Sequence, residues 1–223
     1  MPVNIAIDGP SGAGKSSAAK ALAKKLGYLY IDTGALYRAI GLYAIRQNVP
    51  DLKNADLVAP LLADIDVRLG FVKGEQRVYL NGEDVSGLIR TQPVAQAASD
   101  VSAHPVVRTF LLDLQRKMAA QHNVLMDGRD IGTVILPQAQ VKIFLTANAE
   151  ARARRRTLEL QAKGLEADFE TVLREIKQRD ANDSSRAAAP LKAADDAVLV
   201  DNSDMDEVQT VEYMCRIIKE KLG

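Results

Sequence analysis

The N-terminal segment constrains the fold more than any other part of the 223-residue chain. An apolar run, Val3 to Ile7, precedes a glycine-rich segment, and an alanine- and lysine-rich stretch, Lys15 to Leu26, comes after it. This order predicts a strand, a loop and a helix, with Gly27 as the C-terminal cap of the helix. The loop fits the pattern G-x-x-x-x-G-K-[ST] with Gly9, Pro10, Ser11, Gly12, Ala13, Gly14, Lys15 and Ser16, followed by Ser17.

Such a loop, between a strand and a helix, is typical of proteins that bind a nucleoside triphosphate with Mg²⁺. Glycines let backbone N–H groups turn toward phosphate oxygens, and the helix presents the positive end of its dipole. Lys15 adds a charge close to the β- and γ-phosphates, and the hydroxyl of Ser16 or Ser17 helps to hold the metal. An apolar strand that ends at Asp127 has the form of a Walker B carboxylate, which makes Asp127 a further candidate metal ligand.

Strands and helices alternate along most of the remaining chain. Continuous apolar runs predict parallel strands buried on both faces, at 29–31, 124–126, 141–145 and 197–200. Helical spacing predicts helices at about 35–47, 110–121, 150–163, 169–179 and 205–222. Thr33 and Ser203 are the expected N-caps of the first and last of these helices. The alternation favours an α/β fold built on a parallel sheet.

One segment has a different pattern. Apolar and polar residues alternate from Ile65 to Phe71 and again from Val78 to Asn81, on either side of Lys73-Gly74. The alternation predicts an antiparallel hairpin that is exposed on one face and does not belong to the parallel sheet. We interpret residues 62–96 as an inserted subdomain.

The composition argues against several functional classes. The chain has 29 Lys plus Arg and 29 Asp plus Glu, so the basic excess expected of a protein that binds nucleic acid or an anionic membrane is missing. The single cysteine, Cys215, allows no internal disulfide, and no Cys/His spacing suits zinc. The N-terminus shows no charged leader and no apolar run is long enough to span a bilayer. We expect a cytoplasmic monomer that acts on small molecules, with no nucleic-acid or membrane partner.

Arginines are frequent at loops and helix edges, and no catalytic nucleophile or metal-hydroxide set accompanies them. A GTPase would carry the guanine motif N-K-x-D, which the sequence lacks. An acceptor that is itself a phosphate needs no protein base, because its oxygen is already ionised near neutral pH. Guanidinium groups then offset the repulsion between two polyanions and bind phosphate through two parallel hydrogen bonds. A phosphate loop with many loop arginines is therefore typical of a nucleoside monophosphate kinase.

Five motifs, taken in order, are similar to those of bacterial cytidylate kinases. They lie at 7–15, at 32–38, at 82–86 with 89–91, at 127–134, and at Arg179-Asp180 with Asp183 and Arg186. The resemblance implies a three-layer P-loop nucleoside monophosphate kinase fold with a five-stranded parallel sheet, a small antiparallel β insert and a helical lid. It implies a core of residues 1–61, 97–151 and 187–223, a monophosphate-binding insert of residues 62–96 and a lid of residues 152–186. The implied reaction is transfer of the γ-phosphate of ATP to CMP or dCMP, giving CDP or dCDP plus ADP.

The same resemblance implies roles for individual side chains. Those implied to bind the acceptor phosphate are Arg38, Arg129 and Arg186. Those implied to read cytosine are Ser99, Arg108 and Asp130. Those implied to contact the ribose are Arg179 and Asp183, and the remaining CMP-binding residues are Thr33 and Tyr37. Those implied to act near the transferring phosphates are Lys15, Arg152, Arg155 and Arg156. For Asp183 an alternative stays open, namely that it pairs with Arg186 or Arg179 and positions that arginine.

Other functions would account for parts of the sequence. A kinase of the same fold could act on UMP or another small acceptor, and a small-alcohol kinase would need a base such as Asp32 or Asp127. A nucleotide-dependent switch is disfavoured by the missing guanine motif and by the acceptor-like arginines. A nucleic-acid binder acting through residues 152–156 is disfavoured by the zero net charge.

Overall fold

The structure is a computed structural model that describes residues 2–223. It contains a five-stranded parallel sheet of strand order β2-β6-β1-β7-β8 and a three-stranded sheet of order β3-β4-β5. The predicted α/β class, with a parallel sheet and a small antiparallel insert, is confirmed. The chain forms two compact units, one of residues 3–28 with 123–223 and one of residues 29–122 together with Pro2. No helix within residues 2–223 has the length and apolar character that crossing a membrane requires.

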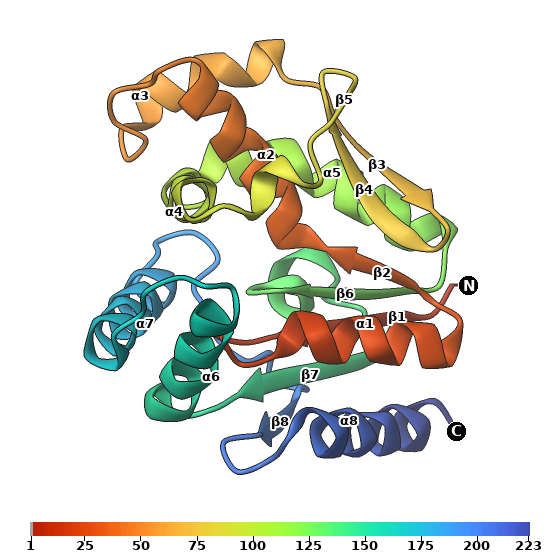
Figure 1. Cartoon of the computed structure of the whole chain (residues 1–223). Coiled ribbons are helices and arrows are strands. Elements are labelled where there is room, and N and C mark those ends of the chain that lie inside the picture. The colour runs from red at the N-terminus through yellow and green to blue at the C-terminus, as the bar shows by residue number, and fades with distance from the viewer. Residues whose placement is uncertain (1) are drawn as a thin grey trace. The chain divides into compact units, whose positions relative to one another are not determined.

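The first unit is built on four parallel strands (Figure 1). They are β1 (Asn4–Asp8), β6 (Val124–Gly128), β7 (Val141–Thr146) and β8 (Val198–Asp201). The central strand β1 pairs with β6 on one side and β7 on the other, so that Ile5 is opposite both Leu125 and Val141. Because β1 and β6 are buried on both faces, their sequences are continuous apolar runs without alternation.

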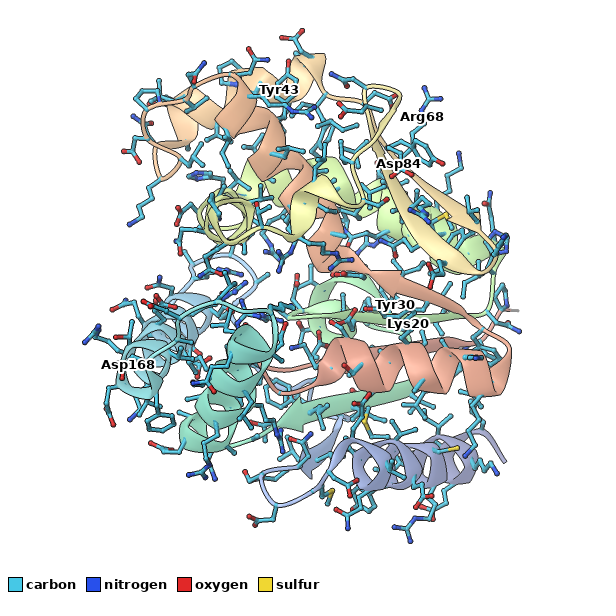
Figure 2. The ribbon with its side chains drawn as sticks, viewed as in Figure 1. Lys20, Tyr30, Tyr43, Arg68, Asp84 and Asp168 are labelled. Carbon is cyan, nitrogen blue, oxygen red and sulfur yellow. The ribbon has the colours of Figure 1, made fainter. Side chains whose placement is uncertain are left out.

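Two helices pack against these strands, and two others pack against one another. The helices are α1 (Lys15–Leu26), α6 (Ala149–Ala162), α7 (Phe169–Ser184) and α8 (Glu207–Leu222), with a π-helical turn, η3 (Ile131–Ile135). Helix α1 ends as predicted at Gly27, which has φ 70° and donates its N–H to the carbonyl of Ala23. Helices α6 and α7 lie side by side and share a small core of Ala153, Val172 and Ile176 (Figure 1). Helix α7 begins after its N-cap Asp168, labelled in Figure 2.

The second unit contains the predicted hairpin. Its elements are β2 (Leu29–Asp32), α2 (Thr33–Arg46), α3 (Ala55–Val58), η1 (Ala59–Asp64), β3 (Val67–Val72), β4 (Glu75–Leu80), β5 (Glu83–Asp84), η2 (Leu88–Arg90), α4 (Gln92–Val101) and α5 (Pro105–Gln121). Strands β3 and β4 are antiparallel with Leu69 opposite Val78, which confirms the hairpin. Its inward side chains join a core formed with α2, while Arg68 and Asp84 are exposed on the β-sheet (Figure 2).

Helices α2 and α4 pack backbone against backbone at Gly41. A Cβ added to Gly41 would stand 2.9 Å from the amide nitrogen of Ala98 and 3.1 Å from the carbonyl carbon of Ala97. Side-chain atoms do not normally approach backbone so closely, and this contact therefore requires a glycine. Sequence analysis missed α4, although its buried residues Val94, Ala97, Ala98 and Val101 have helical spacing. Two of these are alanines, so the contrast with the polar positions is weak.

Two predicted helix caps are wrong, because a nearby aspartate acts in place of the hydroxyl residue. Helix α2 begins at Thr33, and the side chain of Asp32 accepts the N–H of Ala35, so Asp32 is the N-cap. Helix α8 begins later than predicted, and its N-cap is Asp206, which forms a reciprocal capping box with Gln209. The side chain of Ser203 instead donates to Asp201. A carboxylate stabilises the positive end of a helix dipole in addition to accepting the N–H.

Candidate active site

The phosphate loop connects β1 to the first turn of α1, and its backbone requires glycine. Gly9, Gly12 and Gly14 have φ values of 148°, 77° and 82°, which other residues rarely adopt. Gly9 also has no room for a side chain, because a Cβ there would stand 1.9 Å from the carbonyl oxygen of Leu145. The glycines of the sequence pattern therefore lie where the chain conformation demands them.

Lys15 is the first residue of α1, and its side chain returns over the loop. It is 5% exposed, and its Nζ donates to the carbonyl of Pro10 at 2.6 Å. Burial lowers the pKa of Lys15 well below its usual value, and the charge of Arg129 lowers it further, against the opposing effect of Asp127. An anion bound at the loop would favour the protonated lysine and raise this pKa.

Ser16 and Asp127 place two oxygen atoms that could ligate a metal ion beside the loop. The Ser16 Oγ donates to Oδ2 of Asp127 at 2.8 Å, and Asp127 is buried on β6. A hydroxyl and a carboxylate suit Mg²⁺, which takes oxygen ligands and retains water and phosphate in much of its shell. These residues therefore fit the expected metal, and Ser16 rather than Ser17 has the carboxylate partner. No group of three or more His, Cys, Asp and Glu side chains within residues 2–223 is arranged to hold a metal ion.

Asp183 on α7 joins two of the arginines predicted to bind the acceptor phosphate. Nε of Arg129 donates to Oδ2 of Asp183 at 2.9 Å, and Arg186 donates to Oδ1 at 2.5 Å. Burial by itself would raise the pKa of Asp183, but the charges of Arg129 and Arg186 outweigh it and hold this pKa below its usual value. The ionised carboxylate thus fixes both guanidinium groups. Arg179, on the same helix, adds its charge to the cluster.

Asp8 holds the backbone turn that follows Asp130. Its two carboxylate oxygens accept the N–H groups of Ile131 and Gly132, each at 2.7 Å. Burial raises the pKa of Asp8 to about 6, in opposition to these hydrogen bonds. Asp130 itself is 4% exposed. Sequence analysis gave Asp8 no role, although a carboxylate at the end of a buried strand, next to the phosphate loop, was a signal for one.

The three predicted arginines of α6 have different surroundings. Arg152 is buried and contacts the phosphate loop through the carbonyl of Ser11, as well as the carboxylate of Asp180. Arg155 donates to the side chain and the carbonyl of Asn202. Arg156 pairs with Glu159, also on α6, at 2.9 Å. Sequence analysis placed Asp180 in a family motif but gave it no role, and it did not single out Asn202, because such tertiary contacts leave no local pattern.

Five predicted CMP-binding residues lie in the unit of residues 29–122. Thr33, Tyr37 and Arg38 are on α2, Ser99 is on α4 and Arg108 is on α5. The guanidinium of Arg108 lies over the ring of Tyr37, 5.4 Å from its centroid, where the ring face attracts a cation. Arg108 also donates to the carbonyl of Ser102, whose hydroxyl donates to the carbonyl of Ser99. Tyr37, Ser99 and Arg108 are thereby brought into one cluster.

The comparison with a family model decides the family. A model described as cytidylate kinase matches residues 5–220. The chain belongs to the cytidylate kinase family. A cytidylate kinase from Caldicellulosiruptor saccharolyticus is 48% identical over 221 residues, covering 99% of this chain and 97% of that protein. Another cytidylate kinase, from Caldanaerobacter subterraneus, is 50% identical over 220 residues, covering 99% of this chain and 96% of that protein.

The fold of this cytidylate kinase family member also resembles a more distant kinase. A crystal structure of shikimate kinase from Bacteroides thetaiotaomicron aligns with a TM-score of 0.51 and 16% identity, covering 99% of this chain and 98% of that one. At this identity the likeness concerns the fold alone. The family resemblance expected from the motifs is confirmed, and the roles of individual residues stay predictions.

Proposed function

We propose that the chain transfers the γ-phosphate of ATP to CMP or dCMP, giving CDP or dCDP plus ADP. The observation that carries the proposal is a glycine-dependent phosphate loop under Lys15, together with arginines fixed by Asp183, in a member of the cytidylate kinase family. We further propose that the protein acts as a cytoplasmic monomer without nucleic-acid or membrane partners.

The donor nucleotide is proposed to bind at residues 9–17. Backbone N–H groups of the loop, the positive end of α1 and the Lys15 ammonium all act on the same phosphates. Mg²⁺, when bound, supplies positive charge that neutralises the β- and γ-phosphate oxygens. Ser16 and Asp127, which already contact one another, are the residues that would hold it.

The acceptor phosphate is proposed to bind Arg38, Arg129 and Arg186. Their guanidinium groups offset the repulsion between two polyanions and hold the attacking oxygen in line. That oxygen is already ionised near neutral pH, so the reaction needs no protein base. The predicted lid of residues 152–186 contributes arginines near the transferring phosphates, and of these Arg152 contacts the loop at Ser11. Residues 62–96 are proposed as the monophosphate-binding insert and the rest as the core.

The base of the acceptor is proposed to be read by Ser99, Arg108 and Asp130. Cytosine has an amino donor where uracil has a carbonyl, so a carboxylate acceptor prefers cytosine. Thr33, Tyr37 and Arg179 complete the proposed nucleoside contacts. For Asp183, the two hydrogen bonds to Arg129 and Arg186 favour a positioning role over a ribose contact.

A small-alcohol kinase is the second candidate, and it is less well supported. It would require a carboxylate base, such as Asp32 or Asp127. The Asp32 side chain caps α2 through the N–H of Ala35 and accepts a hydrogen bond from Arg90 at 2.8 Å. Asp127 accepts from Ser16. Both carboxylates therefore have structural partners, which favours an acceptor that is already ionised.

A coupled assay of ADP release, with CMP, dCMP, UMP and AMP compared side by side, tests the proposal. We expect the highest kcat/KM with CMP and dCMP. A higher value with UMP would establish the alternative acceptor, and turnover on none of the four would contradict a monophosphate kinase.

A further inference from the structure

Two carbonyl groups of the phosphate loop are held by side chains from distant parts of the chain. Arg152 on α6 donates to the carbonyl of Ser11 at 3.0 Å, and Asn202, after β8, donates to the carbonyl of Ala13 at 3.1 Å. In a trans peptide the N–H and the C=O point in opposite directions. A contact that holds a loop carbonyl therefore also fixes the direction of the N–H in the same peptide plane.

Arg152 has further contacts besides the one to the Ser11 carbonyl. Its Nε donates to the carbonyl of Ala147 at 2.9 Å, and its aliphatic stem lies 3.4 Å from the position that a Cβ of Gly12 would occupy. Its side chain is 5% exposed, so its charge is almost completely removed from solvent. A buried guanidinium is costly unless a negative charge compensates it.

Asp180 on α7 supplies that negative charge. NH1 of Arg152 donates to Oδ1 of Asp180 at 3.0 Å, and NH2 donates to Oδ2 at 2.5 Å. Two parallel hydrogen bonds between a guanidinium and a carboxylate fix orientation as well as distance. The same NH1 group also reaches the Ser11 carbonyl. The orientation that Asp180 imposes on Arg152 is therefore the one that contacts the phosphate loop.

We propose that Asp180 is a positioning residue for the phosphate loop. It orients Arg152, which holds the Ser11 carbonyl and so directs the N–H groups of the loop for binding ATP phosphates. The link to ATP rests on the proposed function, whereas the support of the loop does not.

A purely structural role, as a tie between α6 and α7, is the competing explanation. The same two helices carry a second ion pair, Lys177 with Glu150 at 3.2 Å, in which the side chains are 58% and 48% exposed. Removing this surface pair weakens the attachment of α7 to α6 without removing the Arg152 contact. Glu150→Gln is therefore a matched control for Asp180→Asn.

The test compares wild type, Asp180→Asn, Asp180→Glu and Glu150→Gln. Hydrogen exchange is measured for residues 9–16 in the free protein, and calorimetry gives the Kd values of Mg-ATP and of CMP. In Asp180→Asn we expect exchange of the loop to be several-fold faster, because Arg152 no longer has a fixed orientation. We expect the Kd of Mg-ATP to rise about tenfold, which corresponds to about 1.4 kcal/mol of binding free energy. The Kd of CMP should change less than about twofold, because the loop is the ATP site. Asp180→Glu should lie between Asp180→Asn and wild type, and Glu150→Gln should match wild type.

Three results would overturn the proposal. They are unchanged loop exchange in Asp180→Asn, equal effects of Asp180→Asn and Glu150→Gln, and equal weakening of Mg-ATP and CMP. If Asp180→Asn does not fold, Asp180→Glu carries the same expectation in weaker form, because it retains the charge at a shifted position. A failure of the proposed function is separately visible, as a wild-type protein that phosphorylates none of the monophosphates while its loop exchange still depends on Asp180.

Discussion

Arg129 and Asp183 are 54 residues apart in sequence and are joined by a hydrogen bond of 2.9 Å. The second oxygen of Asp183 accepts from Arg186, so one buried carboxylate orients two cations.

If Asp183 positions these arginines, Asp183→Ala and Arg186→Ala should each lower kcat for every monophosphate acceptor. The double variant should then be non-additive by about 1 kcal/mol or more, as expected for residues in direct contact. A ribose contact would instead raise the KM of CMP more than that of dCMP and give additive losses, so steady-state kinetics with both acceptors distinguishes the two roles.

Lys15→Ala should reduce kcat by two orders of magnitude or more and leave the fold intact. The lysine lies over the loop through its bond to Pro10, and preorganised charge at a transferring group is worth about 3 kcal/mol. Circular dichroism provides the control for folding. Near-normal turnover in a folded variant would show that Lys15 does not act on the phosphates.

Asp130→Ala should weaken CMP much more than UMP. A site built to pair with the amino group of cytosine loses that discrimination when its carboxylate is removed, and we expect the CMP-to-UMP ratio of kcat/KM to fall about tenfold or more. Competition assays with both monophosphates measure the ratio. Equal losses for the two acceptors would leave Asp130 with a structural role only.

Stability should depend on pH through Asp8. Its pKa of about 6 in the folded chain lies above the usual value of 3.8, so the folded state binds this proton more tightly than the unfolded state. The contribution of protonated Asp8 to stability is complete below about pH 4, falls as the pH rises through about 6, and changes by about 3 kcal/mol in total. Denaturant unfolding of wild type and Asp8→Asn measures the difference between their free energies of unfolding. As the pH rises across this range, that difference should shift against wild type by about the same amount. A difference independent of pH would contradict the raised pKa.

Gly9→Ala should destabilise the chain far more than Gly27→Ala. Both glycines have positive φ, but a Cβ at Gly9 meets the carbonyl of Leu145 at 1.9 Å, whereas one at Gly27 meets no atom within 4 Å. The change at Gly27 should cost only the conformational penalty, about 1 kcal/mol, and the change at Gly9 several times more. Thermal unfolding of both variants measures the contrast, and similar losses would mean that the loop relaxes around the added methyl group.

Local sequence patterns predicted those helices and strands whose residues mainly contact residues close to them in the sequence. The strand, loop and helix from Asn4 to Leu26 and the hairpin at 67–80 follow from apolar runs, glycines and alternation. The caps of α2 and α8 were misassigned, since several polar residues near a helix start compete for the same N–H groups.

Long-range contacts in the site could not be predicted in this way. Asn202 and Ala13 are 189 residues apart, and Asp180 on α7 contacts Arg152 on α6. Neither pair has a distinctive spacing, because a tertiary contact depends on packing and not on position along the chain. Asp8 is intermediate, since its place at the end of β1 was visible but its partners Ile131 and Gly132 were not.

The backbone contact at Gly41 involves the residues of α4 that lie next to Ser99. A methyl group at Gly41 would push against Ala97 and Ala98, which directly precede Ser99 on α4. Ser99 is one of the residues proposed to read cytosine. Where Ser99 reads cytosine as proposed, nucleotide preference depends on the α2–α4 contact as well as on the base-reading residues themselves, and Gly41 can change during evolution only together with the residues of α4 that it contacts.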